Sequence, residues 1–146
     1  MISKEKMIEL LNGDLKNEWK HLRFYLYHAS AVTGLHCAEY KELFLKEAAS
    51  EMAHVTEFSD VIRGMGGIAT DESNEFQKFS KPEDIMLAAI KMEEEVVANY
   101  VQRMRQAEML SGIEGNVIDG RWLEIFLEGQ LQASREDLDH FRQMLR

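Results

Sequence analysis

The most informative short pattern in the sequence is Glu51-x-x-His54. Residues three apart on an α-helix point the same way, so a carboxylate and an imidazole at this spacing can bind one metal ion together. The pattern alone is weak because it often arises by chance. It gains weight from Glu18, which lies between Leu15 and Leu22 in the middle of an apolar helical face. These three residues predict half of a metal site in the core of a helical protein.

Glu93 is a third carboxylate on an apolar face, flanked by Ile90 and Val97. An isolated carboxylate in a protein core is costly unless a cation or hydrogen bonds compensate its charge. Several carboxylates on converging faces therefore predict a shared cation. Oxygen-rich sites with an imidazole suit iron or manganese, with zinc as a competitor. We expect one or two metal ions per chain.

Two tyrosines follow two of these carboxylates at the same distance, as Glu18-x6-Tyr25 and Glu93-x6-Tyr100. Each tyrosine lies two helical turns from its glutamate on the same face. Both could be core aromatics with hydrogen-bonded hydroxyl groups, or both could lie next to the metal. On the second interpretation Tyr25 is a candidate catalytic residue. His21 lies near the Glu18 face, but a histidine on a long helix is more often a surface or hydrogen-bonded residue than a ligand.

The elements that must position these groups are helices. Apolar residues recur with helical spacing in four segments, about residues 4–33, 38–63, 80–111 and 119–145. Short links join the first helix to the second and the third to the fourth, which predicts two antiparallel hairpins. The link 66–80 is long enough to run the length of a bundle. The expected fold is an all-α four-helix bundle in one domain, residues 1–146, with one long crossover.

Composition excludes several functional classes. The chain has 146 residues, and its formal net charge of −9 argues against a nucleic-acid partner and favours the attraction of cations. The lone Cys37 rules out an intrachain disulfide framework. The N-terminal residues show no signal pattern, and no apolar run approaches a membrane span. We expect a cytoplasmic protein without a membrane partner.

The sequence resembles the bacterioferritins, most densely over residues 12–67 and more loosely through the last two helices. The resemblance is carried by Asn17-Glu18, Tyr25-Leu26-Tyr27-His28-Ala29 and Ser50-Glu51-Met52-Ala53-His54. It implies a ferritin-like fold and a di-iron site. Carried over to this chain, Glu18 and Glu93 would be terminal ligands, Glu51 a bridge and His54 a terminal imidazole.

The fourth helix departs from the family pattern. Where the family has Glu-Glu-Gly-His, this chain has Leu127-Glu128-Gly129-Gln130. Leu127 thus replaces the bridging carboxylate, and Gln130 could ligate only through its carbonyl oxygen. Glu128 could bind only if the helix were rotated. Met52 stands where haem-binding members place an axial methionine, but an ordinary methionine at a dimer interface is favoured, so haem is not expected.

Three functions are compatible with this pattern. The first is a non-haem ferroxidase that oxidises Fe(II) with oxygen or peroxide, with a role in iron storage or detoxification. The second is a di-iron oxidase or peroxidase of the rubrerythrin kind, although the chain has no Cys-x-x-Cys pair for a rubredoxin-like centre. The third is a non-enzymatic bundle with a degenerate metal site. For each, the expected partners are metal ions and further copies of the chain, from a dimer up to a shell.

Overall fold

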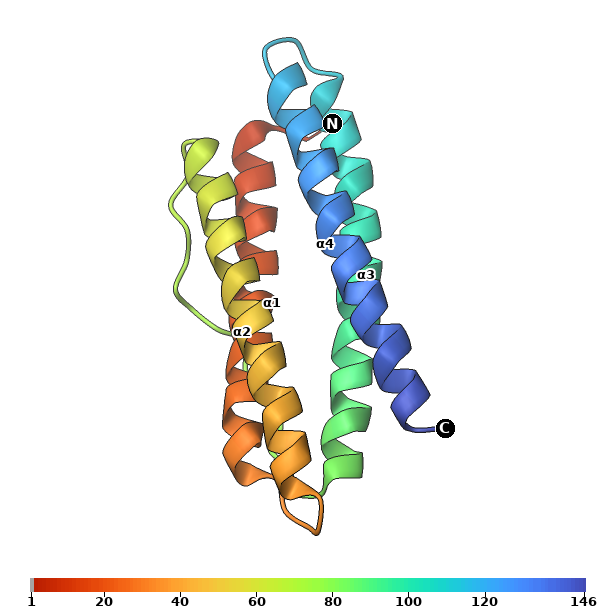
Figure 1. The fold of residues 1–146 in the computed structure, drawn as a ribbon. Helices are drawn as coiled ribbons and strands as arrows, with labels where there is room; N and C mark the ends of the chain where they lie inside the picture. The colour runs from red at the N-terminus through yellow and green to blue at the C-terminus, as the bar shows by residue number, and fades with distance from the viewer. Residues whose placement is uncertain (1) are drawn as a thin grey trace.

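The computed structural model describes residues 2–146, which form four long helices (Figure 1). These are α1 (Lys4–Ala31), α2 (Cys37–Gly64), α3 (Pro82–Ser111) and α4 (Val117–Met144). The predicted all-α bundle is confirmed, and the predicted helix ends lie within two residues of the observed ones. None of the helices within residues 2–146 is long and apolar enough to span a membrane.

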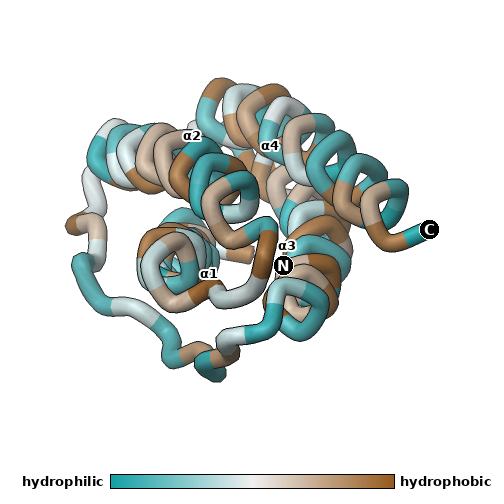
Figure 2. The backbone as a smooth tube through the Cα atoms, turned by 60° about the horizontal axis from the view of Figure 1, so that its bottom comes forward, coloured by the Kyte–Doolittle hydropathy of each residue, from teal (hydrophilic) through white to brown (hydrophobic). Residues whose placement is uncertain are grey.

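The helices form two hairpins, α1 with α2 and α3 with α4, and a long crossover joins them (Figure 1). The crossover, residues 65–81, passes along the outside of α1, as the view closer to the bundle axis shows (Figure 2). Two side chains of α1 hold it by its backbone. Trp19 Nε1 donates to the Thr70 carbonyl at 3.0 Å, and Asn12 Oδ1 accepts from the Thr70 amide at 2.9 Å. The predicted topology is therefore correct.

A buried histidine fixes the far end of the crossover. His28 Nε2 accepts a hydrogen bond from the Phe79 amide at 3.0 Å, and His28 Nδ1 lies 2.8 Å from the Phe24 carbonyl. Both bonds form together only when the ring is neutral with its proton on Nδ1. Burial lowers the pKa of His28 and so favours this neutral form.

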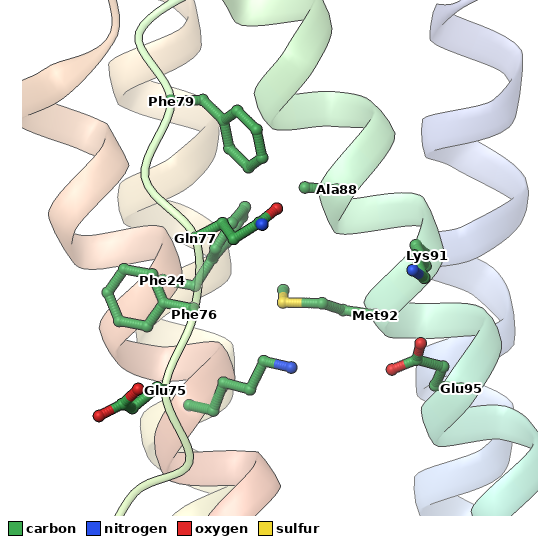
Figure 3. A pocket seen from close by; sticks show the side chains of 10 residues that line it. Phe24, Glu75, Phe76, Gln77, Phe79, Ala88, Lys91, Met92 and Glu95 are labelled. Atoms are coloured by element: carbon green, nitrogen blue, oxygen red, sulfur yellow. The ribbon is translucent and has the colours of Figure 1, made fainter.

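The crossover does not pack flat against α3. A cavity of about 200 Å³ separates them, and apolar side chains line much of it (Figure 3). Phe76 and Phe79 face it from the crossover, Phe24 from α1 and Met92 from α3. The crossover thus covers the α1–α3 side of the bundle and leaves a small space beneath it.

The hydrophobic core is divided into two clusters along the bundle. One contains Leu11 and Phe58, and the other contains Phe24, Phe44 and Phe141. On α1 the two clusters are separated by the stretch that contains Glu18 and His21. The apolar clusters therefore lie above and below a polar layer in the middle of the bundle.

One buried acid near this layer is neutralised by an arginine. Asp14 on α1 is 4% exposed, and Arg103 on α3 binds it with both Nε, at 2.7 Å, and Nη2, at 3.0 Å. Such a bidentate pair compensates much of the cost of burying the carboxylate. Asp14 is thus a structural acid.

A close approach of backbones sets the α3–α4 hairpin. Gly120 in α4 is buried against Ser111 at the end of α3, and a Cβ atom at this position would overlap the Ser111 backbone. Only glycine permits this approach without displacing one of the helices. Gly120 therefore helps to set where α4 lies relative to the polar layer.

Candidate metal centre

Five buried polar side chains meet between the two apolar clusters. They come from three helices: Glu18 and His21 from α1, Glu51 and His54 from α2, and Glu93 from α3. Each lies on the helix face that also carries core residues, so helical spacing alone turns it inward. We refer to these five residues as the buried cluster.

The first part of the buried cluster is the triad that the sequence predicts. His54 Nδ1 lies 3.1 Å from Glu51 Oε2 and 3.5 Å from Glu18 Oε2. The ligand atoms of these three residues all lie within 4.8 Å of one another. One metal ion could contact all three side chains after small rotamer adjustments.

The second part contains a histidine that the sequence analysis did not assign. His21 Nδ1 lies 3.8 Å from Glu51 Oε1 and 3.7 Å from Glu93 Oε1. The ligand atoms of these three residues also lie within 4.8 Å of one another. Glu51 thus presents one oxygen to each triad, as a bridging carboxylate would. The missed signal is Glu18-x-x-His21, which has the same spacing as Glu51-x-x-His54.

Both tyrosine hydroxyl groups contact the buried cluster across the α1–α3 interface. Tyr25 donates to Glu93 Oε1 at 3.3 Å, and Tyr100 donates to Glu18 Oε1. Each tyrosine thus binds the glutamate of the opposite helix, rather than the one that precedes it in sequence. Both rings are buried, and burial together with the charge of Glu93 raises the pKa of Tyr25.

The carboxylates of the buried cluster divide into ionised and protonated forms. Burial and the charge of Glu51 raise the pKa of Glu18 to about 8, and the same two causes raise the pKa of Glu93. Burial opposes ionisation of Glu51 too, but His21 and His54 outweigh it and lower the pKa of Glu51. Without metal, Glu51 is therefore the carboxylate that carries the negative charge.

His54 is the cation that balances this charge in the metal-free protein. Burial disfavours its charged form, but the contacts of its Nδ1 with the carboxyl groups of Glu18 and Glu51 outweigh burial and raise the pKa of His54 to about 11. The pKa of His21 is raised as well, because Glu51 outweighs burial there too. Protons thus occupy the positions from which a metal ion would displace them.

Two buried carboxylate oxygens without a hydrogen-bond partner indicate that the buried cluster suits a metal ion. Within residues 2–146, Glu18 Oε2 and Glu93 Oε2 are buried and accept no hydrogen bond. A buried acceptor without a partner is costly, and a cation between the carboxylates would satisfy both. Carboxylate oxygens with one imidazole in each triad suit iron or manganese. The residues present therefore fit a bound metal.

The structure buries Gln130 and Leu127 of α4 but not Glu128. Gln130 Nε2 donates to Glu57 Oε2 at 2.6 Å, whereas Gln130 Oε1, the atom predicted as a ligand, is buried and accepts no hydrogen bond within residues 2–146. Leu127 packs in the apolar core. Glu128 is exposed on the outer surface because it lies about 100° from the buried face of the helix. The rotation of α4 that would bring Glu128 inward does not occur.

Met52, the residue considered for haem, lies on the surface of α2. Its side chain is 58% exposed, one residue after Glu51. It therefore makes no contribution to the buried cluster.

The comparisons with known proteins agree with this geometry. A family model described as a ferritin-like domain matches residues 8–112, which include Glu18, His21, Glu51, His54 and Glu93. The chain belongs to the ferritin-like family. This confirms the predicted family, whose structural relatives include di-iron-carboxylate proteins. The sequence has no significant match among proteins of curated function.

Solved structures show the same fold at low sequence identity. A ferritin-like di-iron-carboxylate protein from Bacillus anthracis str. Ames is 22% identical, with a TM-score of 0.87 over 100% of both chains. A DPS protein from Vibrio cholerae O1 is 10% identical, with a TM-score of 0.86 over 98% of this chain and 91% of that one. A dodecameric thioferritin from Bacteroides fragilis, described as bacterioferritin-related, is 15% identical, with a TM-score of 0.75 over 99% of this chain and 88% of that one.

Proposed function

We propose that this ferritin-like chain binds ferrous iron in the buried cluster and oxidises it with dioxygen or hydrogen peroxide. The observation that carries the proposal is the pair of triads that share Glu51. Two iron ions on either side of one carboxylate can deliver two electrons together. With peroxide as oxidant, two ferrous ions and two protons convert one peroxide into two water molecules and leave two ferric ions.

The side chains supply what this oxidation needs. Hard, anionic oxygen donors stabilise the higher charge of the ferric product more than that of the ferrous substrate. Glu18 and Glu93 reach their anionic forms when the arriving metal displaces their protons. Tyr25 keeps its hydroxyl group on Glu93, where it can orient that carboxylate and offer a hydrogen bond to an oxidant.

The test is aerobic addition of Fe(II) with ferric absorbance as the readout. Glu51→Gln removes the shared charge and should lower the oxidation rate by more than about tenfold, because metal sites lose at least this much when a supporting group is removed. Glu42→Gln is the matched control, since Glu42 is an exposed residue of the same helix. Equal rates for the wild type and Glu51→Gln would refute the proposal.

The proposed oxidation serves one of two roles, iron storage or the reduction of an oxidant. The contact of both tyrosine hydroxyl groups with the cluster favours an oxidase or peroxidase that reduces an oxidant without retaining iron. Storage requires a closed shell, and the thioferritin from Bacteroides fragilis is dodecameric. We propose that this chain also forms homo-oligomers. Native mass spectrometry distinguishes the roles: a shell that retains ferric iron supports storage, and a dimer that releases it supports the oxidase.

A further inference from the structure

The cavity beneath the crossover has no part in the proposed function. It encloses about 200 Å³ between the crossover and α3 (Figure 3). Its most deeply buried side chains are Phe24 of α1 and Met92 of α3, which are 1% and 6% exposed. Phe76 and Phe79 of the crossover and Ala88 of α3 are half-buried and line its sides. The inner part of the cavity is therefore apolar and rich in phenyl rings.

Hydrogen bonds hold the crossover in place on both sides of the cavity. Before the cavity, Asn74 Nδ2 donates to Asn17 Oδ1 at 2.6 Å. After it, the Thr33 amide donates to the Ser80 carbonyl at 2.9 Å, next to the hydrogen bond that His28 accepts from the crossover. The outer wall of the cavity thus exists before any ligand arrives. A ligand that binds against a preformed wall does not lose affinity to the ordering of that wall.

Contacts between side chains also fix the phenyl rings of this wall. The rings of Phe24 and Phe76 meet edge to face, with their centroids 5.8 Å apart. Arg23 Cζ lies 5.9 Å from the centroid of the Phe76 ring on the crossover. The rings of His28 and Phe79 stack with their centroids 6.1 Å apart. An aromatic ligand could add further contacts of this kind, which stabilise a complex beyond the burial of apolar area.

Charged side chains of both signs surround the outer part of the cavity. The lining includes two lysines and two glutamates, which are Lys20, Lys91, Glu75 and Glu95. Within residues 2–146 none of these four groups forms an ion pair. Because their charges balance, this outer edge favours neither an anionic nor a cationic ligand. Its ammonium donors and carboxylate acceptors can still bind a hydroxyl group.

The cavity lies beside the buried cluster without including it. Phe24 precedes Tyr25, and the two rings meet edge to face with their centroids 5.4 Å apart. Met92 likewise precedes Glu93, the residue to which Tyr25 donates. Among the side chains that line the cavity, none belongs to the buried cluster. A ligand in the cavity would therefore contact neighbours of the Tyr25–Glu93 hydrogen bond and no candidate metal ligand.

We propose that this cavity binds a small, uncharged aromatic molecule with one ring and one hydroxyl group. An apolar cavity of about 150 Å³ accommodates benzene, so a slightly larger one can take a single substituted ring. The ring lies among Phe24, Phe76 and Phe79, and the hydroxyl group points to the charged outer edge. The inference goes beyond the proposed function and does not require that the buried cluster hold a metal.

The test uses phenol as the probe and the full-length protein without added metal. Saturation-transfer difference NMR, which is applicable to monomers and homo-oligomers alike, should give a saturable binding curve. Ala88→Leu places a larger apolar side chain in the cavity and should weaken phenol binding at least tenfold. Ala98→Leu is the matched control, because Ala98 is exposed on the same helix and should leave the affinity unchanged. Urea denaturation verifies that both variants are folded.

Charged analogues of phenol test the ligand class without a mutation. Benzoate and benzylammonium carry a negative and a positive group on the same ring. Both should bind at least tenfold more weakly than phenol, because an outer edge of balanced charge does not compensate the loss of water from an ionic group.

The outcomes are independent of iron oxidation because no metal is added. Saturable phenol binding that Ala88→Leu weakens and Ala98→Leu does not supports the inference. Failure of phenol to reach saturation would overturn it. Equal affinity in the wild type and Ala88→Leu would mean that phenol binds outside the cavity, which also overturns it. Benzoate or benzylammonium binding as tightly as phenol would refute the uncharged ligand class.

Discussion

Metal uptake by the buried cluster should release protons, and the structure sets how many. In the metal-free protein the charge of Glu51 holds His54 as a cation, and burial together with the charge of Glu51 raises the pKa of Glu18 to about 8. A metal ion binds the neutral imidazole and the ionised carboxylates. Binding at Glu18, Glu51 and His54 must therefore expel the protons that these groups hold.

The expected number follows from the two pKa values. With its pKa raised to about 8, Glu18 is mostly protonated at pH 7, and His54, with its pKa raised to about 11, is protonated throughout this range. Glu51 adds none because its pKa is lowered. The first metal ion should thus release between one and two protons at pH 7, and closer to one at pH 8.5, where Glu18 is more ionised.

The assay is calorimetric titration with Mn(II) under nitrogen, in two buffers of different ionisation enthalpy. The difference between the apparent binding enthalpies gives the number of protons released. His54→Gln should lower this number by about one, since the glutamine has no proton to lose. His36→Ala is the control, because His36 is exposed in the turn between α1 and α2 and should not affect proton release.

Two results would refute the reasoning. Saturable Mn(II) binding without proton release at pH 7 would mean that the ligands are already deprotonated in the metal-free protein. Proton release that rises between pH 7 and pH 8.5 would have the wrong sign for a group that loses its proton near pH 8.

Three further predictions concern stability. Asp14→Asn should lower the free energy of unfolding by about 2–4 kcal/mol, because it breaks the buried bidentate pair with Arg103. Asp139→Asn breaks only an exposed pair and should lower it by less than about 1 kcal/mol. Urea denaturation measures both changes. By the same method, Gly120→Ala should lower the free energy of unfolding by about 1–3 kcal/mol, because the added methyl group overpacks the contact with Ser111. At the exposed helical position Gly129, the same change should raise it by about 0.5–1 kcal/mol. No change in stability for Gly120→Ala would contradict the close contact between the helices. The pKa of His28 is lowered from 6.5 in the folded protein, so neutral His28 contributes to the free energy of unfolding at neutral pH, and this contribution is lost as the pH falls. Acidification from pH 7.5 to 5.5 should therefore destabilise the wild type more than His28→Leu.

The fold could be predicted from the sequence because each helix carries its own signal. Apolar residues at helical spacing marked all four helices, and glycines and Pro82 marked their ends. The crossover could be predicted from its length alone. Its attachment could not, because the hydrogen bond from the Phe79 amide to His28 joins residues that are far apart in sequence.

The candidate site could be predicted only in part, for a related reason. Glu18, Glu51 and Glu93 stand out as single acids on apolar faces, so helical periodicity reveals them. His21 follows Glu18 at the same spacing as His54 follows Glu51. Because histidines on long helices more often lie at the surface, this spacing alone did not predict that His21 is buried in the cluster. Helix α4 also follows its periodicity, which turns Leu127 into the core and Glu128 to the surface.

The proposed function requires that Glu18, Glu51 and His54 hold iron together. The most direct measurement is anomalous diffraction at the iron absorption edge from crystals soaked with Fe(II) in the absence of oxygen. We expect a peak in the bundle core about 2.0–2.2 Å from ligand atoms of all three residues, the range of metal–oxygen and metal–nitrogen bonds in such sites. Anomalous peaks confined to exposed acids, with none between these three side chains, would contradict it.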